Sequence, residues 1–192
     1  MMTIEKLQSI FTKKGYIWNP NLNIIGVRNA STNNKVTNVF DDKLIIAYKE
    51  LNVWKIKEFV ITTDPGLYYT KVKLLNPKGV AILVEGQYIN SHQIGLHQGK
   101  YEALVQRGNL KLARDKNMND IYEYSVTEIT NNSGVNIHCA GDDTALVGQN
   151  SAGCQVFKRK KDFLEFMIIC KNYKSILGNQ YTLTLLNSLD LQ

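Results

Sequence analysis

Residues 134–157 read GVNIHCAGDDTALVGQNSAGCQVF, and this stretch predicts two short strands joined by a polar loop. The first strand, residues 135–138, is apolar and ends at His138. Glycine, aspartate and asparagine then mark the loop. The second strand, residues 153–157, begins within the segment Ser-Ala-Gly-Cys, which ends at Cys154. The stretch therefore places a histidine at the end of the first strand and a cysteine at the start of the second.

The rest of the chain is also mostly strand-like, because β-branched and aromatic residues dominate its segments. The apolar run at residues 79–84 suits a strand that is buried on both faces. Further strands are predicted at residues 44–48, 54–62, 121–126 and 181–186. Helices are predicted at residues 3–14 and 161–171, where apolar side chains recur on one face. The predicted fold class is therefore β-rich α+β, a mixed β-sheet domain with about two helices.

The composition is that of a globular protein with a basic surface. The 192 residues include 44% hydrophobic and 21% charged residues, and the formal net charge is +6 at pH 7. Such a surface favours nucleic acid, anionic lipid or an acidic cell-wall polymer. No nucleic-acid-binding motif is present, and basic residues do not alternate with aromatic residues in one patch. We therefore expect no nucleic-acid partner.

Cysteine usage and the N-terminus indicate a reducing compartment. Three cysteines, at positions 139, 154 and 170, do not make a disulfide framework. The N-terminus lacks the apolar core and cleavage site of a signal peptide. No stretch approaches the roughly 18 apolar residues of a membrane span. We therefore expect synthesis in the cytoplasm and no membrane partner.

Cys154 and His138 are the residue types of a nucleophile and its base. A thiol needs a base or a positive neighbour to react near neutral pH, and imidazole has the best-matched pKa. Ala152 and Gly153 are small enough for a substrate carbonyl to approach the backbone, whose N–H groups would hold an oxyanion. The alternative for Cys154 is a buried structural cysteine.

These residues together resemble the catalytic motif of the L,D-transpeptidase catalytic domain family, in its phage-borne and Bacteroidetes-type variants. The resemblance covers residues 79–157. The motif is matched one by one by His138, Ser151, Gly153 and Cys154. Ala152 stands where the family has a second histidine.

The resemblance implies a cysteine enzyme that acts on peptidoglycan stem peptides and uses no cofactor. Cys154 would attack an amide carbon, His138 would carry the proton, and the backbone carbonyl of Cys139 would orient the imidazole ring. Water would resolve the thioester in a peptidase, and a second stem's amine would resolve it in a transpeptidase. The implied fold is L,D-transpeptidase-like over residues 71–192, with residues 1–70 a possible extension of one compact unit.

Hydrolysis is the favoured reaction, because a chain without a signal peptide suits an endolysin better than an exported wall-building enzyme. Such a protein, possibly phage-encoded, would reach the wall after release by a holin or inside a virion. The alternatives are an L,D-transpeptidase and a non-catalytic wall-binding or virion module. The sequence leaves the oligomeric state open. A further hypothesis is an inhibitory disulfide between Cys139 and Cys154.

A second group of residues is expected to contact the substrate. His97 lies between two glycines, and we expect it on a tight, exposed loop that lines the cleft. Arg107 or Arg114 would hold a substrate carboxylate through the planar guanidinium, with surface salt bridging as the alternative. Ser151 and Ala152 would lie beside the scissile bond.

A metal site is not predicted. The chain has three histidines, at positions 92, 97 and 138, and together with Cys154 they would be numerous enough to bind zinc. However, the five-residue spacing of His92 and His97 matches neither one helix face nor a standard zinc motif.

Overall fold

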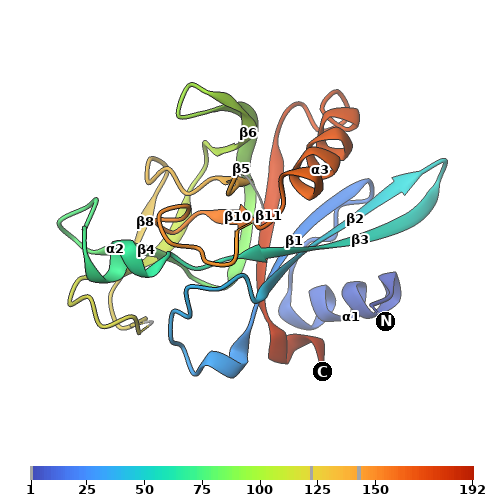
Figure 1. Cartoon of the computed structure of the whole chain (residues 1–192). Coiled ribbons are helices and arrows are strands. Elements are labelled where there is room, and N and C mark those ends of the chain that lie inside the picture. Colours follow the sequence, from blue (N-terminus) through green and yellow to red (C-terminus); the bar gives the residue numbers. More distant parts are fainter. Residues whose placement is uncertain (1, 122, 142–143) are drawn as a thin grey trace.

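The protein is described by a computed structural model over residues 2–121, 123–141 and 144–192. Within these residues the fold is strand-rich α+β, with a closed barrel and a small separate sheet (Figure 1). The helices are α1 (Ile4–Lys14), α2 (Leu67–Lys71) and α3 (Lys160–Asn172), with short 3₁₀ turns η1 (Ala30–Thr32) and η2 (Ser188–Leu191). The strands are β1 (Leu22–Arg28), β2 (Asp42–Glu50), β3 (Val53–Thr62), β4 (Val80–Leu83), β5 (Gly86–His97), β6 (Tyr101–Gln106), β7 (Leu110–Asp115), β8 (Thr127–Thr130), β9 (Ile137–Cys139), β10 (Gln155–Phe157) and β11 (Tyr181–Asn187).

The barrel is a mixed sheet in the order β1-β11-β5-β6-β9-β10-β3-β2, with β2 pairing back to β1. The pairs β1–β11 and β9–β10 are parallel, and the others are antiparallel. Parallel neighbours require a connection that returns the chain to the starting edge. The segment between β9 and β10 makes this return, so the beginnings of these two strands lie side by side. Strands from both sides of residue 70 take part in the barrel.

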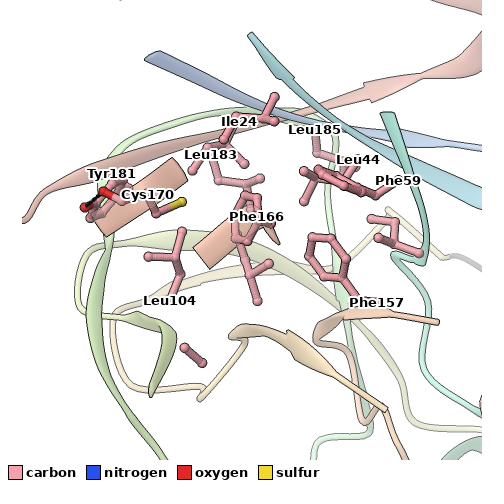
Figure 2. Packing of buried hydrophobic residues seen from close by; sticks show 14 of the residues in the cluster. Ile24, Leu44, Phe59, Leu104, Phe157, Phe166, Cys170, Tyr181, Leu183 and Leu185 are labelled. Carbon is pink, nitrogen blue, oxygen red and sulfur yellow. Dashed lines mark hydrogen bonds between the residues drawn. The ribbon is translucent and has the colours of Figure 1, made fainter. Parts of the chain in front are cut away.

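Side chains from the barrel strands and from α3 share one core. Strand residues such as Ile24, Leu44 and Leu183 pack with Phe166 of α3, and Phe157 of β10 lies beside them (Figure 2). Alternation along a strand sends every second side chain to the same face. The neighbour of Ile24, Ile25, accordingly belongs to a different cluster on the outside of the barrel.

Helix α1 covers that outer cluster. Its apolar face buries Leu7, Ile10 and Phe11 against β1 and β2. Thr3 caps the first turn by accepting a hydrogen bond from the N–H of Lys6, and Gly15, in a left-handed conformation, ends the helix. Both predicted helices are confirmed, with each end within one residue of the predicted position. The described residues also form a third helix, α2, which was not predicted. That helix has five residues, which is too short for a helical pattern to be detected in the sequence.

The small sheet has the antiparallel order β4-β7-β8. Every residue of β4 is buried, which confirms the strand predicted at residues 79–84. The strand predicted at residues 121–126 is wrong in its described part, because the strand there is β8, which begins at residue 127. Residue 122 lies outside the described residues. The segment before β8 forms a turn and an isolated bridge at Ile121, so its β-branched and aromatic side chains do not form a ladder.

The buried side chain of Arg28 joins the ends of three strands near the segment that carries Cys154. Arg28, 2% exposed at the end of β1, donates hydrogen bonds to the carbonyl oxygens of Thr63 and Leu83, at 3.1 and 2.8 Å. It also pairs with the carboxylate of Asp64, with Nε 3.2 Å from Oδ1. Full pairing compensates for the large desolvation cost of a buried charge. This network fixes the turn that begins at Asp64 and that contacts the cysteine-bearing segment.

Candidate active site

A cavity of about 360 Å³ brings together most of the predicted site residues. Because Gln155 pairs with Ile137 in the parallel β9–β10 ladder, the residue before Gln155 lies beside the residue before Ile137. Cys154 therefore lies next to Asn136 and opens into the same cavity as His138. The predicted residues that line this cavity are His97, Arg114, His138, Ala152 and Cys154.

The Ser-Ala-Gly-Cys segment is a tight turn held by its own hydrogen bonds. The Ser151 hydroxyl donates to the carbonyl oxygen of Cys154 at 2.9 Å and accepts from the N–H of Gly153 at 3.2 Å. The N–H of Gly66 donates to the carbonyl oxygen of Ser151 at 2.8 Å. Ser151 is therefore buried behind the cavity, and it shapes the turn without reaching the cavity wall.

Gly153 has a conformation that other residues rarely adopt. Its φ is +117°, and a Cβ atom there would lie 2.4 Å from the carbonyl oxygen of Ala81. Glycine alone accommodates both the dihedral angle and the close approach of β4. The glycine of the motif thus sets the path of the backbone into Cys154.

The hydrogen bonds of His138 decide which ring nitrogen can act as a base. Its Nδ1 atom lies 3.0 Å from the carbonyl oxygen of Cys139 and 3.3 Å from the hydroxyl of Tyr101. A carbonyl oxygen only accepts, so Nδ1 carries the proton and the lone pair of the neutral ring is on Nε2. The Tyr101 hydroxyl also donates to the Cys139 carbonyl at 3.3 Å, which anchors this carbonyl from a second side.

Both members of the pair are neutral in the resting site. Burial, and then the charge of neighbouring His97, lower the pKa of His138 to about 4. Burial raises the pKa of the Cys154 thiol to about 11, against a smaller lowering effect of the Asn136 N–H. At neutral pH the pair is therefore a thiol and an imidazole, and proton transfer must accompany attack on a substrate.

Two backbone contacts hold the thiol. The sulfur of Cys154 lies 3.4 Å from the N–H of Asn136 and 3.4 Å from the carbonyl oxygen of Gly134. The carbonyl receives the S–H proton of the neutral form, and the N–H stabilises negative charge when the proton leaves. Among the described residues, the N–H of Cys154 itself has no protein acceptor. That N–H is available to an oxyanion formed at the sulfur.

The two arginines differ in their places. Arg114 lines the cavity, and its guanidinium binds the carboxylate of Glu128 through Nε and a terminal nitrogen, at 2.9 and 2.6 Å. Arg107 is exposed and faces an adjoining cavity, where it donates to the carbonyl oxygen of Gln106 at 2.9 Å. The structure therefore does not bring Arg107 to Cys154. It lies just beyond the end of β6, and its guanidinium lies beside Gly95 of β5.

His97 reaches the cavity from a different kind of element than expected. It is the last residue of β5, paired with Tyr101 across the hairpin, and it is 7% exposed. The expected exposed loop position is wrong, because the left-handed turn begins one residue later, at Gln98 and Gly99.

Two further residues at the site, Asn136 and Tyr101, were not predicted from the sequence. Asn136 lies two residues before His138, so strand alternation was a usable signal that the two face the same side. Tyr101 comes from β6, which pairs with β9 through Leu104 and Ile137. No local sequence pattern predicts the contact of Tyr101 with His138, because this contact depends on the order of strands in the barrel.

No known protein-family model, curated protein or solved structure matches this chain. Within residues 2–121, 123–141 and 144–192, no three histidine, cysteine or acidic side chains are grouped as metal ligands. No helix of the described chain is both long and apolar enough to cross a bilayer.

We expect no disulfide between Cys139 and Cys154 under mild oxidation. Cys139 pairs with Phe157, whereas Cys154 lies beside Asn136, which is three residues before Cys139 and directly precedes β9. Three residues of strand span about 10 Å, and a disulfide needs Cα atoms within about 7 Å. Non-reducing peptide mass mapping after diamide treatment checks this. A linked Cys139–Cys154 peptide in the folded protein would contradict the described register.

We expect iodoacetamide to label Cys154 slowly at neutral pH and faster toward pH 11. Only the thiolate reacts, so a pKa of about 11 makes the rate rise with pH. The rise should be about tenfold per pH unit below the pKa. Mass spectrometry of the Cys154 peptide measures the rate, and buried Cys170 in the same sample should remain unlabelled. A rate that is already constant from about pH 6 upward would instead indicate a preformed thiolate–imidazolium pair.

Proposed function

We propose that the protein is a cysteine peptidase that cleaves amide bonds in peptidoglycan stem peptides through a thioester. The observation that carries this proposal is the hydrogen bond from His138 Nδ1 to the Cys139 carbonyl, at 3.0 Å. It leaves Nε2 as the basic nitrogen of a ring that lines the same cavity as Cys154. The proposed substrate class comes from the resemblance of the Ser-Ala-Gly-Cys segment to the L,D-transpeptidase motif.

The proposed reaction has two steps. Nε2 of His138 takes the thiol proton while the sulfur of Cys154 attacks the amide carbon, and the N–H of Cys154 faces the resulting oxyanion. Collapse of this intermediate breaks the C–N bond, and His138 returns the proton to the leaving amine. Water then attacks the thioester, gives one proton to His138, and releases the acid and the thiol. If a second stem's amine replaces the water, the same site makes a cross-link.

The walls of the cavity fit an extended peptide that carries a carboxylate. Side-chain amides line it from Asn76, Gln98, Gln149 and Asn150, in addition to the amide of Asn136, which is bound to Gln106 and His97. Arg114 is the one fully charged side chain among the described lining residues. Side-chain amides pair with peptide groups, and a guanidinium attracts a carboxylate. Because Glu128 already occupies part of the guanidinium, a substrate carboxylate would share it.

Digestion of purified peptidoglycan, read by mass spectrometry of the released muropeptides, tests the proposal. Wild-type protein should release shortened stems or separated cross-links, and Cys154→Ala should release none. Cys170→Ala is the matched control, because it removes a buried thiol of the core that lies outside the cavity. New cross-links would identify a transpeptidase. Unchanged muropeptides with all three proteins would contradict the enzyme and favour a wall-binding or virion module.

The proposed place of action is the cell wall, reached after release from the cytoplasm in which the chain is made. A phage-encoded endolysin, released by a holin or carried in a virion, is the setting that fits this order of events. The basic chain, with a net charge of +6, suits approach to an anionic wall polymer.

A further inference from the structure

Two histidines lie face to face in the cavity that Cys154 lines. The rings of His97 and His138 are stacked, with centroids 4.1 Å apart and planes inclined by 19°. Both side chains are buried, at 7% and 6% exposure. They come from β5 and β9, which are not neighbours in the barrel, so the stack spans β6. The reaction proposed above uses only one of the two rings.

Asn136 fixes the second ring and also touches the nucleophile. Its Oδ1 accepts from the N–H of Gln106 at 2.8 Å, which settles the orientation of the amide. Its Nδ2 then donates to Nδ1 of His97 at 3.0 Å, so neutral His97 carries its proton on Nε2. The backbone N–H of the same residue contacts the sulfur of Cys154. One residue therefore joins the thiol to the second imidazole.

We propose that His97 is a positioning residue, which packs on the base His138, is held there by Asn136, and opposes the charging of His138. The proposal rests on the assignment of His138 as the base of the peptidase. Through its contact with His138, the His97 side chain would set the pH range of the reaction.

The physical argument is repulsion between like charges. Two imidazolium rings at stacking distance in a buried site cannot both be charged without a large energetic cost. Burial is the largest influence that lowers the pKa of His138, and the charge of His97 comes next. The polar groups in contact with the ring of His138 are Tyr101 from β6 and Cys139 from β9. Cys154, before β10, and Arg114, from β7, line the same cavity.

Histidine NMR titration of the full chain tests the proposal without a substrate. In His97→Phe the stacked ring and the burial remain but the charge is lost, so the pKa of His138 should rise by roughly one unit. Buried His92, whose ring contacts Ser91 and the Val135 carbonyl, is the internal reference and should not shift. His97→Gln, which retains an acceptor for Asn136, should give the same direction and serves if the Phe variant does not fold.

The outcomes are distinct. A rise in the His138 pKa, with the low-pH limit of Cys154-dependent cleavage moving upward by the same amount, supports the proposal. An unchanged His138 titration in a folded variant overturns it and leaves the peptidase reaction standing. Muropeptides that remain intact with wild-type protein would contradict the peptidase, while the titration would still measure the coupling between the rings.

Discussion

His138→Asn should lower the rate of stem-peptide cleavage by about 10³-fold, because the substitution removes the proposed general base. The asparagine amide takes the position of the Nδ1–H group, so it still has a donor for the carbonyl oxygen of Cys139. It has no nitrogen lone pair to accept the thiol proton. With the pKa of Cys154 raised to about 11, the variant has almost no thiolate at neutral pH. Cleavage rates at matched protein concentrations measure the loss.

The pH dependence of the wild type provides the second half of this prediction. The base must be neutral to work, so the rate should fall as the pH drops through the His138 pKa of about 4. That low-pH limit should be missing from the small residual activity of His138→Asn. Thermal unfolding close to that of the wild type is the control for folding. A variant that cleaves within a few-fold of the wild type would contradict the role of His138.

The sequence predicted the part of the site that lies within one strand–loop–strand segment. His138 and Cys154 line one cavity, and Gly153 sets the turn before the cysteine, because the two ends of this segment pair as β9 and β10. Arg107 was grouped with this site on residue type alone, and a residue's type does not say which way it faces. The roles of Asn136 and Tyr101 depend on the order of strands in the closed barrel, which no local pattern contains.

The same distinction applies to the fold. The strand-rich α+β class and both long helices follow from local patterns, and the structure confirms them. The closed barrel could not be predicted, since it depends on pairings such as β1 with β11 between opposite ends of the chain. The strand expected at residues 121–126 shows the limit of composition. Its β-branched and aromatic residues resemble a strand, but the ladder to β7 forms through Thr127–Thr130 instead.

Gly153→Ala should abolish measurable cleavage and destabilise the fold by about 3 kcal/mol, since both backbone strain and a steric clash are introduced. The φ of +117° disfavours any L side chain, and the new Cβ would meet the carbonyl oxygen of Ala81 at 2.4 Å. That oxygen belongs to β4, whose residues are all buried, so it cannot move aside cheaply. The turn must shift instead, and Cys154 shifts with it.

A matched control separates strain from the clash. Gly178 also has a positive φ, +59°, but a Cβ there would meet nothing within 4 Å. Gly178→Ala should therefore lower the free energy of unfolding by only about 1 kcal/mol. Cleavage should be unchanged, because Gly178 lies after α3 and outside the cavity. Urea unfolding gives the stabilities, and muropeptide release gives the rates. If the two alanine variants were equally stable and equally active, the close approach of Ala81 to the turn would be wrong. If only Gly153→Ala loses activity, the position of the cysteine depends on that contact with β4.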